Sequence, residues 1–587
     1  MLGSLVGVFL TFLFIFLIFL GIIFSSVSQL SKQDVKTVKV KTNSVLRMTL
    51  ENEIPERTSN NPLANFSLGS SFEKIPVGLN DILANIEKAK DDKSIKGIYL
   101  DISSIPAGIA TLEEIRNALI DFKSSKKFIV AYSEGYSQGA YYLASVADKI
   151  YLNPQGMVEF KGLSRQIMFY KNLLGKLEVE MQIFRHGKFK SATEPLFLDK
   201  MSKENREQTT TYISSIWNYI VEGISKERNI SADELNSYAD RMLITDGESA
   251  LKYKLVDKLV YKDEMLDILT ELTGSKTADK INYVDMRKYV HAPRAKSIPY
   301  SKNKIAVVYA SGSIESGDGD ENSIGSDNVS KAIREARLDE NVKAIVLRVN
   351  SPGGSALASD VIWREVVLAE KVKTVVVSMG DVAASGGYYI ACAADAIVAH
   401  PNTITGSIGV FGVFPNMKNL FSNKLGITVD TVNTNAHADI MSPYRPVASD
   451  EAEVIQHWIE NTYTDFITKV GEGRKIPTAS VDSIGQGRVW SGADAKRIGL
   501  VDEFGGIKDA IALAAKKAKL KTYNLEELPK QKEPFEELIS SVFDENALVE
   551  SKLRKEFGTT YENYRSLKDV LKYKGIQMRM PYDVVLY

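Results

Sequence analysis

The sequence predicts an α/β protein made of two tandem copies of one unit, preceded by one transmembrane helix. Short β-branched strands alternate with segments of helical periodicity, the chain repeats itself at a fixed offset, and a long apolar run stands near the N-terminus. The chain has 587 residues, 44% of them apolar and 25% charged, which is ordinary for globular domains. This length allows about two to four domains.

The apolar run near the N-terminus occupies twenty residues, 5–24, and the first charged side chain is Lys32. A helix of this length spans about 30 Å, which matches the hydrocarbon core of a bilayer. A cleaved signal peptide is the alternative, but the run is longer than the usual apolar segment and no clear cleavage site follows. We therefore expect residues 1–30 to form a transmembrane anchor. Lysines follow the span and no basic residue precedes it, so charge alone leaves the orientation open.

The duplication becomes visible when Tyr141 is aligned with Tyr388, at an offset of 247 residues. The same ungapped register aligns apolar, acidic, proline and glycine positions: Ile86 with Ile333, Ala89 with Ala336, Asp92 with Asp339, Ile98 with Ile345, Leu100 with Leu347, Asp148 with Asp395, Pro154 with Pro401 and Gly162 with Gly409. So long a register is not expected by chance, and it indicates a repeated domain. The expected parts are a first repeat at 45–270, a linker at 271–303, a second repeat at 304–525 and a C-terminal tail at 526–587.

The α/β pattern is clearest in the second copy. Three short β-branched or apolar runs are typical of buried parallel strands: AIVLRV at 344–349, TVVVSM at 374–379 and AIVA at 396–399. Helical spacing marks the segments 331–342 and 359–371, and a further helix is expected after Ser385. This alternation predicts crossover units and a mainly parallel sheet.

The two copies differ at the positions where chemistry is expected. The register places Ser385 opposite Gln138, Gly353 and Gly354 of NSPGG opposite Pro106 and Ala107, and Ser407 opposite Phe160. Structural residues should persist in both copies, whereas catalytic residues need persist in only one. The first copy is therefore the degenerate one.

Ser385 stands where a predicted strand gives way to a helix, and Gly386 supplies the next backbone N–H. Glycines after a buried strand let N–H groups approach a ligand closely, and two such donors can form an oxyanion hole. Proline has no N–H, so Pro106 could not donate. A tight turn is the structural alternative for the serine alone, but the loss of the whole set from the sister copy favours a nucleophile.

A serine nucleophile needs a base within hydrogen-bond reach. None of the five histidines shares a motif with a suitable acid, although a Ser-His-Asp triad assembled in space stays open. The segment FRHGKFKSATEP at 184–195 offers Lys188 and Lys190. Such a basic cluster is most often a solvated face. To act as a base, Lys190 would need burial to lower its pKa from about 10.4 towards about 7–8.

NSPGGS, GDVAASGGYYIACAADAIVAHPNTITGSIGVFG and FRHGKFKSATEP, in a duplicated chain, resemble the signal peptide peptidase A (protease IV) family, peptidase family S49, in its long two-repeat form. This resemblance implies a membrane-anchored serine endopeptidase with a Ser-Lys dyad. Ser385 would be the nucleophile, Lys190 the general base and acid, and Ser407 the residue that orients Lys190. Gly353 or Gly354, together with Gly386, would form the oxyanion hole.

The same resemblance implies that each repeat is a spiral α/β unit of the crotonase and caseinolytic-protease type. It also implies a homotetramer at the bacterial inner membrane, single-pass, with the catalytic body on the periplasmic side. The expected substrates are remnant signal peptides and other apolar peptides. The absence of a basic residue ahead of the span departs from the usual family pattern.

Two other functions compete with the peptidase: a crotonase-like acyl-thioester enzyme, which would not need Ser385, and a non-catalytic membrane scaffold. No phosphate-binding loop motif and no His/Cys cluster with metal spacing occur, so we expect no ATP, no metal and no cofactor. The net charge of −1 gives no reason to expect nucleic acid as a partner. Cys392, the single cysteine, lies in an apolar run and is expected to be a core residue.

Overall fold

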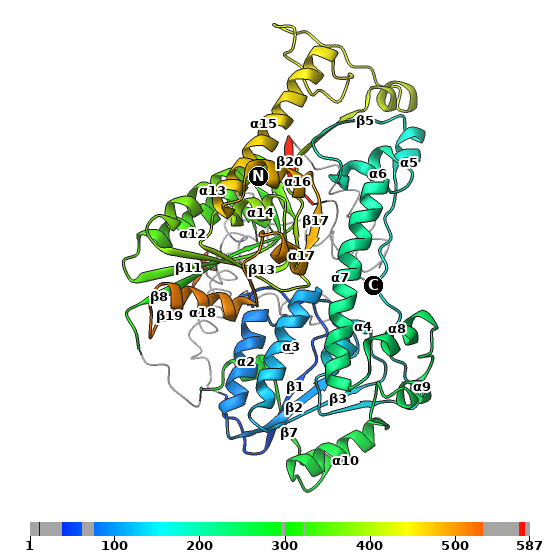
Figure 1. Cartoon of the computed structure of the whole chain (residues 1–587), viewed down its shortest axis with the longest axis vertical. Coiled ribbons are helices and arrows are strands. Elements are labelled where there is room, and N and C mark those ends of the chain that lie inside the picture. Colours follow the sequence, from blue (N-terminus) through cyan, green and yellow to red (C-terminus); the bar gives the residue numbers. More distant parts are fainter. Residues whose placement is uncertain are drawn as a thin grey trace.

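The computed structural model describes residues 38–60, 76–294, 300–320, 323–531 and 575–580, together with Gly7, Thr11 and Phe14. Its two α/β repeats lie one above the other, the first below and the second above in Figure 1. The expected anchor at 1–30 lies outside the described residues, apart from those three. Within the described part of the chain, no helix combines the length and the apolar character needed to cross a membrane.

The first repeat is built on a six-stranded parallel sheet. Its strand order is β6 (Lys258–Leu259), β4 (Lys149–Leu152), β3 (Phe128–Ser133), β2 (Ile95–Asp101), β1 (Ser44–Met48) and β7 (Asn282–Asp285). The helices of this repeat are α2 (Leu79–Asp91), α3 (Ile109–Lys123), α4 (Gln138–Ala144), α5 (Lys171–Lys176), α6 (Glu194–Phe197), α7 (Lys203–Arg228), α8 (Ala232–Asp240), α9 (Gly247–Lys252), α10 (Lys262–Thr273) and α11 (Met286–Val290). The described part of this repeat also contains the 3₁₀ turns η2 (Ser191–Thr193) and η3 (Ala278–Lys280).

The second repeat has an eight-stranded sheet that is parallel except for its β15–β17 pair. The main path is β17 (Val489–Ser491), β15 (Ile404–Gly406), β13 (Thr374–Ala384), β11 (Val342–Ser351), β8 (Lys304–Ser311) and β19 (Asn524–Leu528), with β14 (Ala396–Ala399) and β18 (Glu503–Phe504) branching from β13. The helices are α12 (Ser326–Leu338), α13 (Ala356–Glu370), α14 (Gly386–Ala391), α15 (Ser449–Arg474), α16 (Thr478–Ile484), α17 (Gly492–Arg497) and α18 (Ile507–Lys517), with a short π-helix, η4 (Leu420–Lys424).

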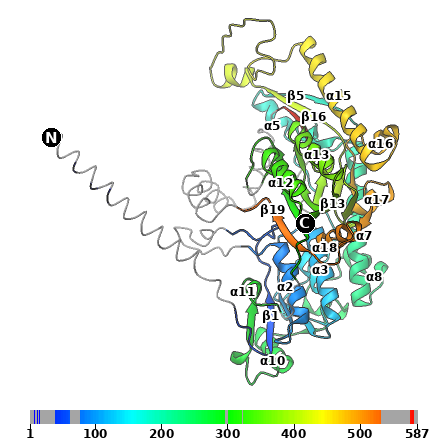
Figure 2. The same ribbon diagram turned by 90° about the vertical axis from the view of Figure 1, so that its left-hand side faces the viewer.

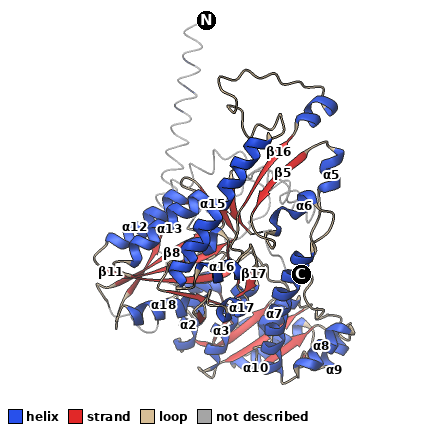
Figure 3. Cartoon of the chain, turned by 45° about the horizontal axis from the view of Figure 1, so that its top comes forward, coloured by secondary structure: helices blue, strands red, loops and turns tan. Residues whose placement is uncertain are grey.

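Helices and sheets alternate in layers. On the second sheet, Leu347 and Val377 pack under α12, α13 and α14, while Val346 and Val376 face α18 and the first repeat. On the first sheet, Val45 packs with α10 on the outer face. Figures 1 and 3 show α2, α3 and α18 between the two sheets. Strands buried on both faces explain the continuous apolar runs of the sequence.

The structure confirms the predicted α/β fold with two tandem copies. Strands β4 and β14 have bounds that differ by the same 247 residues, and the long helices α7 and α15 have 26 residues each. Structural side chains recur as well. Tyr141 donates its hydroxyl to the Leu255 carbonyl at 2.8 Å, and Tyr388 donates to the Leu500 carbonyl at 2.9 Å.

A third sheet joins the two repeats and the tail. Its order is β10 (Ser323–Gly325), β9 (Ser313–Glu315), β12 (Gly353–Ser355), β20 (Ile576–Arg579), β16 (Phe411–Asn416) and β5 (Glu180–Arg185). Strand β5 belongs to the first repeat and pairs antiparallel with β16 of the second. Figure 2 shows β5 and β16 together, far from β1. This pairing carries the segment after β5 into the second repeat.

Two of the expected boundaries differ from the structure. Residues 271–303 were expected to be a linker, but β7 adds a sixth strand to the first sheet and α11 packs beside it. The first repeat therefore extends to about residue 290. The tail expected from residue 526 supplies part of β19 and all of β20, so pieces of it belong to two sheets.

The two repeats are also joined by a buried ion network. The Arg348 guanidinium on β11 contacts Glu56 Oε2 at 2.8 Å and Glu114 Oε1 at 2.7 Å, and both carboxylates come from the first repeat. Burial opposes the ionisation of Glu114, but Arg348 overcomes that cost and the pKa falls to about 2. At Glu56 burial prevails and raises the pKa. Arg348 thus bridges two buried carboxylates of the first repeat at the junction.

Candidate active site

Ser385 lies at a sharp bend between β13 and α14. Its φ is +57° and its ψ is −114°, a conformation that is strained for a residue with a side chain. The Ser385 N–H donates to the Gly406 carbonyl at 2.8 Å, which holds the bend against the end of β15. Ser407, the residue after Gly406, also has a positive φ, of +49°. Both serine side chains are fully buried.

Lys190 reaches this bend from the first repeat. After β5 the chain turns at Gly187, and the Phe189 N–H donates to the Gln486 carbonyl at 2.9 Å. The backbone then passes so close to Gly487, which has a φ of +78°, that a Cβ there would lie 2.6 Å from the Lys190 Cβ. Glycine is therefore required at this crossing.

The Lys190 amine lies 2.8 Å from the Ser385 hydroxyl oxygen, and 3.1 Å from both the carbonyl and the hydroxyl oxygen of Ser407. Lys190 is completely buried, and this burial holds its pKa well below its usual range. A neutral amine has two N–H donors and one lone pair. An ammonium would donate to all three oxygens, whereas a neutral amine can donate twice to Ser407 and accept the Ser385 O–H.

All five histidines lie in the described part of the chain, and none is a hydrogen-bond partner of the Ser385 hydroxyl. The nearest candidate from the sequence, His400, is buried beside Glu114, with 3.7 Å between its Nε2 and Oε1 of that residue. The basic group beside the Ser385 hydroxyl is therefore the Lys190 amine, and the described residues do not form a Ser-His-Asp triad with Ser385. Lys188, the other lysine of the same segment, is exposed.

Gly353 and Gly386 meet beside Ser385. A Cβ built on Gly353, which has a φ of +94°, would lie 2.6 Å from the Gly386 nitrogen. The Gly353 N–H donates to Ser351 Oγ at 3.1 Å. Gly354 instead backs onto β9, where a Cβ would lie 2.0 Å from the Ile314 carbonyl oxygen. The structure thus brings Gly353 and Gly386 together, while Gly354 permits the close approach of two strands.

The described piece of the tail lies across this site. Strand β20 pairs antiparallel with both β12 and β16. A Cβ built on Gly353 would lie 2.1 Å from the Met578 carbonyl oxygen, and one built on Gly386 would lie 3.0 Å from it. An extended chain therefore runs between the two strands, with one carbonyl held against the paired glycines.

Comparison with protein families identifies the family of this chain. Residues 121–276 and 368–521 match the model of peptidase family S49. The chain belongs to peptidase family S49. Both matched segments lie at corresponding places in the two repeats, so each repeat carries the family's domain.

Two relatives agree with this assignment. This S49 peptidase is 42% identical over 469 residues to Protease 4 of Salmonella typhi, covering 78% of this chain and 75% of the relative. It is 32% identical over 513 residues to the chloroplastic serine protease SPPA of Arabidopsis thaliana, covering 86% and 74%. Among solved structures, it matches ClpP1 from Listeria monocytogenes with a TM-score of 0.23 and 19% identity, covering 35% of this chain and 92% of that one. The chain is a serine endopeptidase of family S49.

No sequence pattern pointed to Gln208, a buried glutamine on α7 that supports the Lys190 turn of this S49 peptidase. Its amide nitrogen donates to the Phe189 carbonyl at 3.0 Å and to Ser191 Oγ at 2.9 Å. Its amide oxygen accepts the Val489 N–H of β17 at 3.0 Å. Gln208 thus ties the turn to the second repeat. One glutamine in a polar helix carries no motif, so only the fold reveals it.

Replacing Gln208 with leucine should lower kcat about 10- to 100-fold with little change in KM, because it displaces the turn that holds the Lys190 amine 2.8 Å from the Ser385 hydroxyl. The control is Thr210→Leu, which places the same side chain at an exposed position of α7. Steady-state kinetics and a melting curve of each variant check this prediction. An unchanged kcat in folded Gln208→Leu would show that the turn holds without it.

Proposed function

We propose that this S49 peptidase is a membrane-anchored endopeptidase that uses Ser385 and Lys190 as a Ser-Lys dyad to degrade cleaved signal peptides and other apolar peptides. The observation that carries the proposal is the 2.8 Å contact between the Lys190 amine and the Ser385 hydroxyl inside a fully buried site. A serine needs such a base to become a nucleophile. Burial supplies the neutral amine that a base requires.

In the proposed reaction, the Lys190 amine takes the hydroxyl proton of Ser385 as the serine oxygen bonds to a peptide carbonyl carbon. Ser407 keeps the amine oriented through its carbonyl and hydroxyl oxygens. The resulting ammonium then gives its proton to the leaving amine as the peptide C–N bond breaks. A water molecule, deprotonated by the same amine, attacks the acyl-enzyme, and the proton returns to the Ser385 oxygen.

The backbone N–H groups of Gly353 and Gly386 are the proposed oxyanion donors. The Met578 carbonyl oxygen lies close to both glycines, so a carbonyl of an extended chain can reach this point of the site. Each donor of such a pair contributes roughly 3–4 kcal/mol in a transition state. The Gly353 N–H would exchange its Ser351 partner for the oxyanion.

The position of β20 also supports an extended substrate. A peptide that replaced β20 would complete the sheet between β12 and β16, antiparallel to both. Main-chain pairing of this kind accepts many sequences, which suits an enzyme that degrades assorted peptide remnants. The apolar run at 5–24 supports a membrane anchor, which would hold the enzyme where apolar remnants accumulate.

The remaining parts of the proposal come from the family resemblance. They are a homotetramer, the bacterial inner membrane as the location, a single membrane pass, and a catalytic body on the periplasmic side.

An assay of detergent-solubilised full-length protein tests the proposed activity. An apolar leucine-rich peptide should be cleaved, a charged peptide of equal length should be spared, and Ser385→Ala should cleave neither. Equal cleavage of both peptides would overturn the proposed substrate class.

The pH dependence of this enzyme should follow the Lys190 amine. Because burial lowers the Lys190 pKa, the amine should be neutral from that lowered pKa upwards, and kcat/KM should rise with pH through one ionisation below about 10.4. Ser407→Ala removes one of the oxygens that the amine contacts, and it should alter this ionisation. Rates measured across the pH range on one apolar peptide check this. A profile flat down to pH 4 would contradict it.

A further inference from the structure

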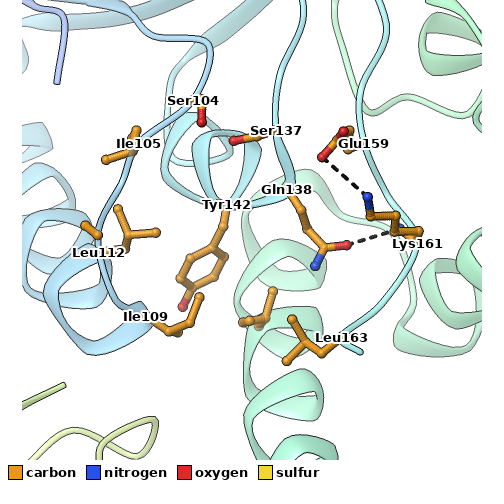
Figure 4. Close-up of a pocket in the computed structure, with 13 residues that line it drawn as sticks. Ser104, Ile105, Ile109, Leu112, Ser137, Gln138, Tyr142, Glu159, Lys161 and Leu163 are labelled. Atoms are coloured by element: carbon orange, nitrogen blue, oxygen red, sulfur yellow. Dashed lines mark hydrogen bonds and ion pairs between the residues drawn. The ribbon is translucent and has the colours of Figure 1, made fainter. Parts of the chain in front are cut away.

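The first repeat contains a cavity at the place where the second repeat has its catalytic site. Its volume is about 310 Å³, and it is lined from α3, α4, α7 and the segment 159–163. At the offset of 247 residues, its lining residues Gln138 and Gly139 correspond to Ser385 and Gly386. Figure 4 shows Gln138, Tyr142 and Leu163 around this space. The cavity is thus the counterpart of the catalytic cleft.

The catalytic groups are missing from this counterpart. The Gln138 side chain turns to the neighbouring backbone: its amide oxygen accepts the Lys161 and Gly162 N–H groups, each at 3.1 Å, and its amide nitrogen donates to the Gly162 carbonyl at 3.1 Å. Pro106, opposite Gly353, has no N–H to donate. The position of Ser385 thus carries no hydroxyl, and the position of Gly353 carries no N–H.

The first repeat nevertheless has an open cavity at this position. Its lining is mixed: the apolar side chains are Ile105, Ile109, Leu112, Tyr142, Leu163 and Ile220, and the polar ones are Ser104, Ser137, Gln138, Glu159 and Lys161. Glutamine is larger than serine, yet Gln138 bonds to the 161–162 backbone and leaves the cavity open.

The cavity is also reachable from solvent. Ser104 and Lys161 line it and are exposed, and Lys161 lies 3.8 Å from the Glu159 carboxylate in a partly exposed ion pair. Its volume is near the lower end of small-ligand sites, which span about 300–1,000 Å³. That size suits one or two apolar side chains of a longer molecule.

The second repeat indicates the occupant. Its equivalent site holds an extended chain, β20, whose Met578 backbone lies against Gly353 and Gly386. The first repeat retains Gly139 opposite Gly386, and a Cβ there would lie 3.2 Å from Leu112 Cδ1. We propose that the first-repeat cavity is a second, non-catalytic site that binds apolar side chains of the same extended peptides. This inference rests on the substrate class in the proposed function.

Cys392 allows a direct test. It is the single cysteine, it is fully buried, and burial raises its pKa to about 12, so an introduced thiol would be the reactive one. Leu163→Cys and Ser104→Cys place a thiol in the wall and at the exposed rim. Met242→Cys places one on the first repeat outside the residues that line the cavity, where the side chain is 74% exposed. All three variants are made in full-length Ser385→Ala protein, which should not consume the peptide.

Each variant is labelled with a maleimide, with and without a saturating leucine-rich hexapeptide amide. The peptide should slow labelling at Leu163→Cys and Ser104→Cys about tenfold or more, and it should leave Met242→Cys unchanged. If the peptide leaves the labelling rates at Leu163→Cys and Ser104→Cys unchanged, the second site is overturned, even if wild-type enzyme cleaves the hexapeptide in a Ser385-dependent manner. Loss of that Ser385 dependence would instead overturn the proposed function.

Discussion

Replacing Lys190 with methionine should abolish peptide hydrolysis and, at neutral pH, raise the thermal stability of the protein. The loss of rate should approach 10⁴-fold, about the upper end of what a general base contributes. The gain arises because folding keeps the buried Lys190 amine neutral, with a pKa below its unfolded value of about 10.4. Between those two pKa values the unfolded chain binds one more proton, so the protonation of Lys190 favours unfolding. Methionine removes that cost.

The same difference in proton binding predicts how the stability of the protein changes with pH. The contribution of Lys190 to stability should increase as pH rises from its folded pKa to about 10.4, and the Lys190→Met protein should lack this slope. Lys188→Met is the matched control, because Lys188 is exposed two residues away in the same turn. Calorimetry at several pH values, with an assay of each variant, checks both parts. A Lys190→Met protein with more than a tenth of wild-type activity would contradict the proposed role.

Replacing Arg348 with methionine should lower the free energy of unfolding by about 3–5 kcal/mol, since it leaves the carboxylates of Glu56 and Glu114 buried without their shared cation. The pKa of Glu114 should rise from about 2, so the loss should be smaller in acid, where the carboxyl groups are neutral. Urea unfolding followed by fluorescence and circular dichroism measures the change.

Arg334→Met is the control for that experiment. Arg334 pairs with Glu365 at 2.7 Å, but its side chain is 52% exposed, so its loss should cost less than about 1 kcal/mol. Adding Glu56→Leu and Glu114→Leu to Arg348→Met should restore much of the stability, because the buried charges are then absent. A cost for Arg348→Met as small as that of Arg334→Met would show that the network does not stabilise the junction.

The local sequence pattern was sufficient to predict the strands and helices around the nucleophile. The run AIVA gave the bounds of β14, and TVVVSM marked the start of β13, because strands buried on both faces need continuous apolar residues. The duplication then singled out Ser385, since a comparison inside one chain separates structural positions from chemical ones. Both inferences depend on short-range patterns or on a fixed register.

Contacts set by distant pairing could not be predicted in this way. An arginine in the apolar run AIVLRV implies a buried partner, but Glu56 lies 292 residues away and carries no local signal. The pairing of β5 with β16, and of β20 with both β12 and β16, depends on strand edges that only the folded chain brings together. For the same reason the local pattern around Lys190 favoured a solvated basic face, and only the family resemblance pointed to its burial.

The rate at which a fluorophosphonate labels Ser385, measured against pH, tests most directly the claim that Lys190 activates this serine across the two repeats. In the wild-type protein, labelling should rise through a single ionisation below pH 10.4, the approximate value of an unperturbed lysine. In folded Lys190→Met it should be about 10²-fold or more slower than wild type above that ionisation, and the difference should shrink below it. Equal labelling rates in the two proteins would contradict the account, because the serine would then be activated by some other base.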